Sequence, residues 1–228
     1  MRAQRILVWN IRHGGGRRAA AIVEALLAQA PSVIVLTEFR WDGSGDVIRK
    51  QLQAEGYDSP CLPVAPPTRN GVFVCAREPF SVSKPVELTD HEERFVWATF
   101  DEFEVCGLYF PQQRAKEPLF NGLLSLSENV CGRPTLLVGD FNTGLHGRDE
   151  AGATFYCSDK LQALLDNGWT DVWRSRHQEA REYSWFSTHG NGFRIDHALA
   201  SASLDAMVRS AFYSHDERIQ RVSDHSMM

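Results

Sequence analysis

The chain has 228 residues, 43% of them hydrophobic, and a formal net charge of −5 with histidine counted as neutral. This length and composition predict one globular domain over residues 1–228 with a large apolar core. No apolar run approaches a membrane span, and the run Ile6–Trp9 is too short for the core of a signal peptide. The acidic balance does not itself favour nucleic-acid binding, although a local basic rim and bound metal ions would still allow it.

The five cysteines are scattered and show no Cys-x-x-Cys spacing. This usage argues against a cysteine zinc site and favours the reducing cytoplasm. We expect a monomer without a membrane segment.

The hydrophobic pattern of the first half alternates strands with helices and then gives a run of hairpins. It predicts strands over 5–11 and 32–37, helices over 17–30 and 46–55, and strands over 71–76, 80–87, 94–100 and 103–109. The second half returns to helices and strands. It predicts helices over 117–131 and 158–167, the latter capped by Ser158, and strands over 183–187 and 193–200. This order favours an α/β sandwich with mixed sheets over a barrel or a dinucleotide-binding fold.

The stretch from Thr135 to Gly144 organises the rest of the chain. Leu136 to Val138 form a short apolar run that is typical of a strand buried on both faces. Asp140 and Asn142 follow it, and side chains two residues apart on an extended chain point to the same side. Asp, Asn and Gly are also common turn residues, so this stretch alone leaves a structural and a functional interpretation open.

Polar residues that a core strand does not need follow several of the other predicted strands. They are Asn10, Glu38, Tyr109, Asp140 with Asn142, Asp196 with His197, and Asp224 with His225. Carboxylates and carboxamides without cysteine make a hard oxygen-donor site that suits Mg²⁺ or Mn²⁺ rather than zinc. Such an ion binds phosphate and can activate water, so the pattern indicates metal-assisted phosphoester hydrolysis.

Six short blocks in this order resemble the endonuclease/exonuclease/phosphatase superfamily. They are Val8-Trp9-Asn10, Val35-Leu36-Thr37-Glu38, Tyr109-Phe110-Pro111-Gln112, Gly139-Asp140-Phe141-Asn142, Arg194-Ile195-Asp196-His197 and Ser223-Asp224-His225. The tyrosine at 109, the stretch Tyr183–Phe186 and the pair Gly71-Val72 are most similar to the exodeoxyribonuclease III and apurinic/apyrimidinic endonuclease branch. The resemblance implies a four-layer α/β sandwich, in which two packed mixed β-sheets have helices outside.

The resemblance also implies roles for the strand-end residues. It implies a metal site with Glu38, Asn10 and Asp224, and a catalytic set of Tyr109, Asp140, Asn142, Asp196 and His225. Asp196 would orient the ring of His225, which would contact the scissile phosphate. Either Asp140 or His225 could be the general base, and the sequence leaves that choice open.

Five residues are expected to bind the substrate, which we expect to be DNA. They are Arg12, Arg114, Trp185, Phe193 and Arg194. Arginines would contact backbone phosphates, and the aromatic pair falls where this branch builds a pocket for a flipped abasic sugar. Solvated surface arginines and ordinary core packing are the structural alternatives for these positions.

The chain departs from the branch in two ways. The segment from Asn142 to Asp159 is shorter than in the repair enzymes, where it helps to grip the duplex, and this puts abasic-site specificity in question. The family normally continues past the histidine with one more core strand, whose absence predicts a C-terminal segment of low stability.

Three functions follow from these observations. The first is a metal-dependent DNA exonuclease or abasic-site endonuclease that acts in DNA repair. The second is a phosphodiesterase or phosphatase of the same superfamily for a small or lipid phosphoester. The third is a binding module with an inactive site, which the retention of all six blocks makes the weakest.

Overall fold

The computed structural model describes residues 3–62, 66–127 and 133–228. Its first sheet has three strands in the order β1-β2-β3, which are β1 (Ile6–Asn10), β2 (Val33–Phe39) and β3 (Gly71–Ala76). The pair β1–β2 is parallel and β2–β3 is antiparallel, so this sheet is mixed.

The second sheet has six strands in the order β4-β5-β6-β7-β11-β8. They are β4 (Ser81–Ser83), β5 (Phe95–Thr99), β6 (Glu104–Tyr109), β7 (Thr135–Asp140), β8 (Thr170–Asp171) and β11 (Asp196–Ala200). The pair β6–β7 is parallel and the other pairs are antiparallel. A separate hairpin joins β9 (Trp185–Phe186) to β10 (Gly192–Phe193).

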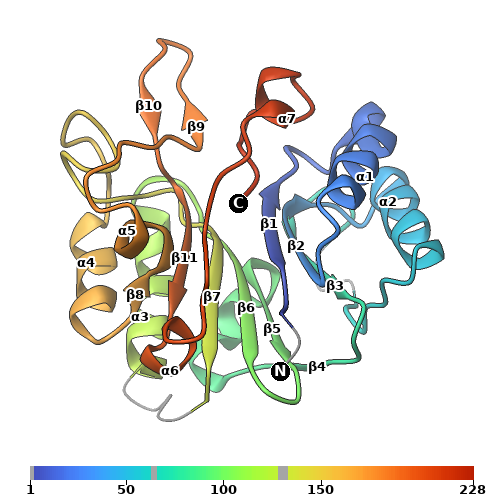
Figure 1. Cartoon of the computed structure of the whole chain (residues 1–228), viewed down its shortest axis with the longest axis horizontal. Helices are drawn as coiled ribbons and strands as arrows, with labels where there is room; N and C mark the ends of the chain where they lie inside the picture. The colour runs from blue at the N-terminus through green and yellow to red at the C-terminus, as the bar shows by residue number, and fades with distance from the viewer. Residues whose placement is uncertain (1–2, 63–65, 128–132) are drawn as a thin grey trace.

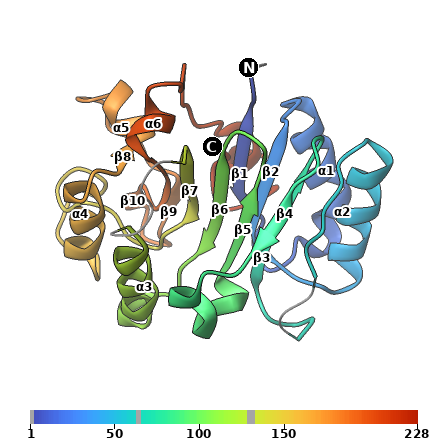
Figure 2. The same cartoon turned by 90° about the horizontal axis from the view of Figure 1, so that it is seen from below.

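Helices cover the outer faces of the two sheets, which pack against each other (Figure 1). Helices α1 (Ala19–Ala28) and α2 (Gly43–Ala54) cover the first sheet, and α3 (Glu117–Ser127) and α4 (Ser158–Asp166) cover the second (Figure 2). A core cluster rich in valine, including Val35, Val74, Val105 and Val138, fills the space between the sheets. Two further clusters lie under the helices. This confirms the predicted four-layer α/β sandwich.

Several predicted elements differ from the structure. The strand expected over 80–87 ends at Ser83, and a 3-10 segment over Val86–Arg94 follows Pro85. Ser158 does not cap α4, because the N-cap residue is Cys157 in a left-handed conformation. The described part of α3 ends at Ser127, so the end predicted for it at 131 lies outside the described residues.

Three short helices had no sequence signal, because they are too short to show a hydrophobic period. They are α5 (Val172–Arg176), α6 (Ala202–Asp205) and α7 (Asp216–Ile219).

Strand register brings the polar strand ends together. Tyr109 on β6 pairs with Asp140 on β7, and Asp140 pairs with Asp196 on β11. Close approach of the backbones requires Gly139, since a Cβ there would lie 1.9 Å from the carbonyl oxygen of Leu108. The sheet therefore places three predicted site residues side by side on adjacent strands.

The segment after α7 runs back to the first sheet. Val8 and Met228 exchange backbone hydrogen bonds of 2.7 and 3.0 Å, and Ser226 and Met227 are buried. Trp9 donates its indole N–H to the carbonyl oxygen of His225 at 3.0 Å. These contacts fix His225 between the two sheets. The low stability expected of this segment stays a prediction.

Candidate active site

The amide of Asn10 joins carboxylates from both sheets. Its Nδ2 donates to Asp140 Oδ2 at 2.9 Å and to Glu38 Oε1 at 3.3 Å. The backbone N–H of Arg12 donates to Asn10 Oδ1 at 2.9 Å, which fixes the orientation of the amide. Asn10 therefore acts here as a hydrogen-bond donor to the acidic residues.

Glu38 lies in a bulge of β2, where the register shifts between Thr37 and Phe39 and Glu38 itself has a φ of 54°. The bulge turns its side chain toward the second sheet, where the Tyr109 hydroxyl donates to Oε1 at 3.4 Å. Its other oxygen, Oε2, accepts from the backbone N–H of His13 at 2.7 Å and from Asn70 Nδ2 at 2.9 Å. Glu38 is thus held mainly through Oε2, and Oε1 has only long contacts.

The turn after β7 holds Asp140 and Asn142 together. Asp140 Oδ1 accepts the backbone N–H of Asn142 at 2.8 Å, and Asn142 Nδ2 donates to the Phe110 carbonyl oxygen at 2.8 Å. Asn142 has a φ of 49°, and Arg12 and His13 also have positive φ values. Left-handed backbone at non-glycine residues stores strain and is found often at functional sites. Sequence alone gave no sign of this clustering.

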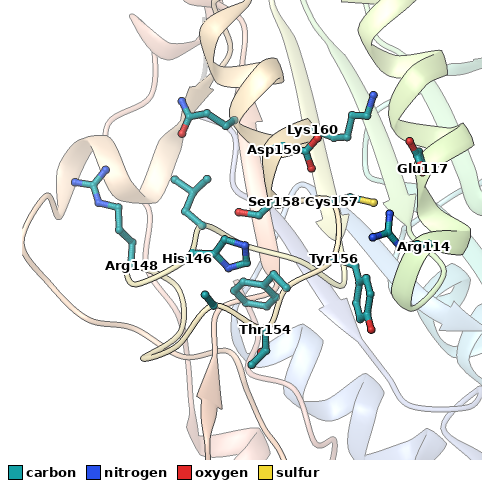
Figure 3. A pocket seen from close by; sticks show the side chains of 14 residues that line it. Arg114, Glu117, His146, Arg148, Thr154, Tyr156, Cys157, Ser158, Asp159 and Lys160 are labelled. Carbon is teal, nitrogen blue, oxygen red and sulfur yellow. The ribbon is translucent and has the colours of Figure 1, made fainter.

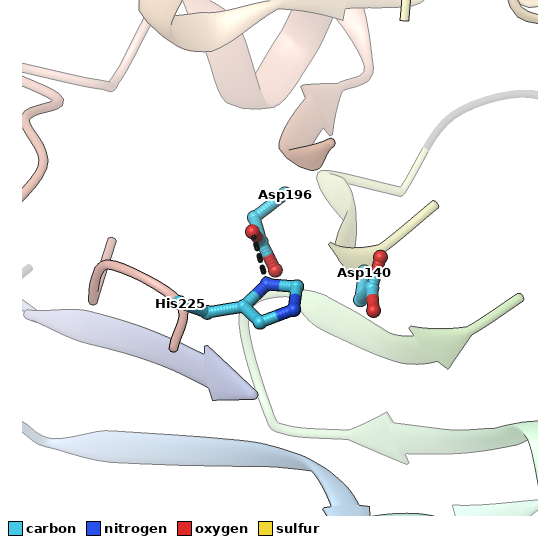
Figure 4. A group of neighbouring side chains, drawn as sticks. All are labelled: Asp140, Asp196 and His225. Atoms are coloured by element: carbon cyan, nitrogen blue, oxygen red, sulfur yellow. Dashed lines mark hydrogen bonds and ion pairs between the residues drawn. The ribbon is translucent and has the colours of Figure 1, made fainter. Parts of the chain in front are cut away.

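His225 and Asp196 form a buried pair. His225 Nδ1 lies 2.8 Å from Asp196 Oδ2, and the second ring nitrogen faces Asp140 (Figure 4). The hydroxyl of Ser184 accepts the backbone N–H of Asp196 at 3.2 Å and fixes the start of β11. The pair can orient an imidazole toward a group bound beside Asp140, and the catalytic role that the resemblance implies for it stays a prediction.

Burial shifts the pKa values of three of these groups. Burial and the nearby Asp196 carboxylate raise the pKa of Asp140 to about 7. Burial alone would lower the pKa of His225, but the Asp196 carboxylate outweighs it and raises the pKa to about 9. Burial and Glu38 raise the pKa of Tyr109 to about 12, so its phenol stays a neutral donor. At neutral pH the site combines a weakly basic carboxylate with a protonated imidazole.

The donor set fits a divalent cation. An oxygen each of Asp140 and Asp196 and a ring nitrogen of His225 lie within 4.8 Å of one another. Among the described residues, Asp196 Oδ1 and Asp224 Oδ1 are buried and accept no hydrogen bond. A buried carboxylate oxygen without a donor is costly, and a bound cation would satisfy it. Glu38 Oε1, with only long contacts, is a further oxygen ligand of the kind that Mg²⁺ prefers.

Trp185 lies beside His225, and Phe193 lies on Trp185. Trp185 lies 6.4 Å from the His225 ring and 5.7 Å from the Phe193 ring, measured between centroids. Arg12 is exposed, with its Nε 3.7 Å from Asp224 Oδ2. These three predicted substrate-binding residues lie beside the catalytic set, and their role stays a prediction.

Arg194 has a different place from the one expected. Its side chain is fully buried, with Nε 2.7 Å from Asp149 Oδ1 and Nη2 2.5 Å from Asp171 Oδ2. The prediction that it contacts a phosphate is wrong, because its donors are used by two buried carboxylates and no solvent reaches them. It anchors the loop that carries Asp149 to the second sheet.

Sequence reasoning missed Lys116 and Asn70. Lys116 is 1% exposed, and its ammonium donates to the backbone carbonyl of Asn142. Asn70 Oδ1 accepts from Arg40 Nε at 2.6 Å while its Nδ2 holds Glu38. Neither residue ends an apolar strand, which was the signal that identified the others.

A pocket of about 790 Å³ lies between α3, α4 and the loop after β7 (Figure 3). Arg114 and Lys160 line it together with Tyr156, and the guanidinium of Arg114 lies 5.8 Å from the centre of the Tyr156 ring. The loop is continuous with the site, since Thr143 Oγ1 donates to the Tyr156 carbonyl oxygen at 2.9 Å. Figure 3 shows polar and charged side chains around an open hollow, which suits an extended polar ligand.

Within the described ranges, none of the helices combines the length and the apolar character needed to cross a bilayer.

Comparison with known proteins gives one family. The model of the endonuclease/exonuclease/phosphatase family matches residues 7–225. Among solved structures, a 3′ phosphatase, NExo, from Neisseria, bound to a product DNA hairpin, is 25% identical with a TM-score of 0.85 and covers 99% of this chain and 97% of its own. A 3′-5′ exonuclease, NExo, from Neisseria meningitidis is 26% identical with a TM-score of 0.82, and the coverages are 97% and 96%.

An AP endonuclease from Archaeoglobus fulgidus has a TM-score of 0.86 at 18% identity, with 99% of this chain and 97% of that chain covered. At that identity it supports the fold alone.

Proposed function

This chain belongs to the endonuclease/exonuclease/phosphatase family, and from that premise we propose that it is a divalent-metal-dependent phosphodiester hydrolase that acts on DNA. The observation that carries the proposal is the Asn10 amide, which holds Glu38 from one sheet and Asp140 from the other. Opposite Asp140 lies the imidazole of His225, oriented by Asp196. This is the set of groups that hydrolysis of a phosphodiester needs: oxygen ligands for a cation, a base and a charge stabiliser.

In the proposed mechanism Asp140 is the general base. Its pKa, raised to about 7, suits a group that takes a proton from water near neutral pH. His225 is protonated there, because its pKa is raised to about 9, so it stabilises charge on the phosphate rather than accepting the proton. Tyr109 donates a hydrogen bond from its neutral phenol.

The metal is proposed to be Mg²⁺ or Mn²⁺, held by Glu38 and Asp224 beside the carboxylates of the second sheet. When bound, such an ion polarises phosphoryl oxygens and lowers the pKa of water. The unpartnered oxygens of Asp196 and Asp224 support a cation, and their carboxylate chemistry supports a hard one. We further propose that the protein is a monomer and that it is located in the cytoplasm. The free thiols of Cys61, Cys75, Cys106 and Cys157 support this location.

DNA is favoured over a small or lipid phosphoester by the pocket beside the site. A polymer that places one phosphate at Asp140 has neighbouring nucleotides, and Arg114 and Lys160 with the exposed ring of Tyr156 offer them charge and a stacking surface. The Neisseria NExo structure that holds a product DNA hairpin, which is 25% identical in sequence, supports the same substrate class. Abasic-site cleavage, exonuclease action and removal of a 3′ phosphate are the reactions to compare.

The test is cleavage of three fluorescent duplexes, which carry an abasic site, a recessed 3′ end or a 3′ phosphate, with Mg²⁺. We expect at least one to be processed, with loss of the activity in EDTA and in Asp140→Asn. Arg114→Gln should raise KM for that duplex and leave turnover of bis(p-nitrophenyl) phosphate unchanged. Turnover of the aryl phosphodiester with no cleavage of any duplex would contradict DNA as the substrate and favour a small or lipid phosphoester.

A further inference from the structure

Lys116 is buried at the end of the 3-10 segment Gln113–Lys116, whose other three residues are exposed. Its side chain is 1% exposed, and it forms no ion pair with any carboxylate in the described part of the chain. Moving an ammonium group out of water without a countercharge is expensive, so such lysines are rare. What this ammonium contacts is therefore informative.

The ammonium donates to the carbonyl oxygen of Asn142. Two other polar groups of Asn142 are held as well: its backbone N–H by Asp140 at 2.8 Å, and its side-chain Nδ2 by the Phe110 carbonyl at 2.8 Å. Lys116 thus adds a third held group to a residue whose φ is 49°. An asparagine in this conformation is strained and needs surrounding contacts to stay there.

The turn held in this way carries two of the proposed catalytic groups. Asp140 precedes the turn and Asn142 ends it, and the amide of Asn142 also lies 3.3 Å from Asp140 Oδ2. The carboxylates of Asp140 and Asp196 come together on adjacent strands, and a substrate phosphate would add further negative charge. A fixed positive charge behind the turn offsets this repulsion without contacting the substrate.

We infer that Lys116 is a positioning residue of the hydrolase: its hydrogen bond to Asn142 keeps Asp140 and Asn142 in their reactive orientation, and its buried charge offsets the negative charge of the site. This inference rests on the proposed function. A lysine that served only the fold would stabilise the protein, whereas a positioning lysine lowers stability through its desolvation and raises turnover.

The test variants are Lys116→Met, which keeps the length of the side chain and removes the charge, and Lys116→Arg, which keeps the charge. Lys50→Met is the matched control, since Lys50 is exposed on α2. We expect Lys116→Met to lower kcat by about 10- to 100-fold and to change KM less than about twofold. This is the usual effect of losing a residue that holds a catalytic residue in place without contacting the substrate. Its melting temperature should stay equal or rise, and Lys116→Arg should recover part of kcat.

Turnover is measured on the cleaved duplex and on bis(p-nitrophenyl) phosphate, and NMR follows the side-chain amide of Asn142 in each variant. Loss of kcat on both substrates together with a displaced Asn142 signal supports the inference. Full kcat in Lys116→Met, or a fall in melting temperature that accounts for the lost activity, overturns it.

If Lys116→Met does not fold, the kcat of Lys116→Arg decides, and activity no better than that of Asp140→Asn overturns the inference. If the wild type hydrolyses the aryl phosphodiester and no DNA, the DNA proposal fails while Lys116 is still judged on the aryl substrate. If it hydrolyses neither, the proposed function fails, and an unmoved Asn142 signal overturns the positioning role separately.

Discussion

Two groups of buried charges, one that contains Arg194 and one that contains Asp196, differ in how their charges are balanced. In the first, Arg194 contacts the carboxylates of Asp149 and Asp171, and Arg174 lies 3.0 Å from Asp149 as a second cation. In the second, the imidazole of His225 lies 2.8 Å from Asp196, and an oxygen of Asp140 lies within 4.8 Å of both groups. The first group has a donor for each carboxylate, and the second keeps an unpartnered carboxylate oxygen.

This difference separates buried charges that stabilise the fold, as around Arg194, from buried charges that can bind a ligand, as around Asp140 and Asp196. Buried carboxylates are normally paired, so a balanced cluster needs nothing from outside the chain. Excess negative charge, raised pKa values and left-handed backbone in one place point to a functional site. Each of the following predictions tests this separation, from the largest expected effect to the smallest.

Asp140→Asn should lower kcat by about 10³-fold or more, because it removes the proposed general base. The same variant in metal-free protein should melt no lower than the wild type, since ionising this buried carboxyl beside Asp196 is unfavourable. Steady-state kinetics measure the fall in kcat, and thermal unfolding measures the melting temperature. Retained activity with a lowered melting temperature would place Asp140 among the structural charges.

Arg194→Met should lower the free energy of unfolding by about 3–5 kcal/mol, because it leaves Asp149 and Asp171 buried beside a weaker set of donors. Urea unfolding measures this loss, and Mg²⁺ should not restore it. A loss below about 1 kcal/mol would mean that the cluster relaxes or takes up water. The Arg194 cluster would then not be a set of charges that stabilises the fold.

Acid should weaken the balanced cluster. Burial alone would raise the pKa values of Asp149 and Asp171, but Arg194 outweighs it and holds both below the ordinary value. Because the folded values lie below the unfolded ones, this stabilisation is complete above the unfolded pKa of about 3.9 and is lost as the pH falls through the folded values. The urea midpoint of the wild type should therefore drop between about pH 5 and about pH 2, and that of Arg194→Met should drop less. If the urea midpoints of the two proteins fell equally with pH, Arg194 would not be the cause of the lowered pKa values of Asp149 and Asp171.

Asp46→Asn should change the free energy of unfolding by less than about 0.5 kcal/mol. Asp46 pairs with Arg49 at 3.1 Å on α2, but both side chains are well exposed. This variant is the control for the other carboxylates, since it removes a charge pair that water already screens. A loss comparable with that of Arg194→Met would show that pairing, rather than burial, sets the size of the effect.

The fold and the strand-end residues could be predicted because both follow from local pattern. Apolar runs define β1, β2, β6 and β7, and the residues that end them meet because neighbouring strands share an edge. Asn10, Glu38 and Tyr109 were found by this logic, and the structure brings them together.

The supporting residues could not be predicted, since their partners are distant in sequence. Arg194 looks like any arginine until the fold places Asp149 and Asp171 around it, 45 and 23 residues away. The burial of Lys116 could not be predicted either, because a lysine in a short 3-10 segment normally faces solvent. Burial of a charge is a property of the assembled layers, which no local pattern encodes.

The Asn10 amide spans the space between the two sheets, so the reactive geometry depends on how far apart they sit. Gly107 on β6 shows how little room is left: a Cβ there would lie 2.7 Å from Val35 of the opposite sheet. A single methyl group added at Gly107 would meet only valine side chains of the first sheet, yet it would push the sheets apart and lengthen the bridge from Asn10 to Asp140. The valines between the sheets therefore act as a spacer that sets the width of the active site as well as forming the core.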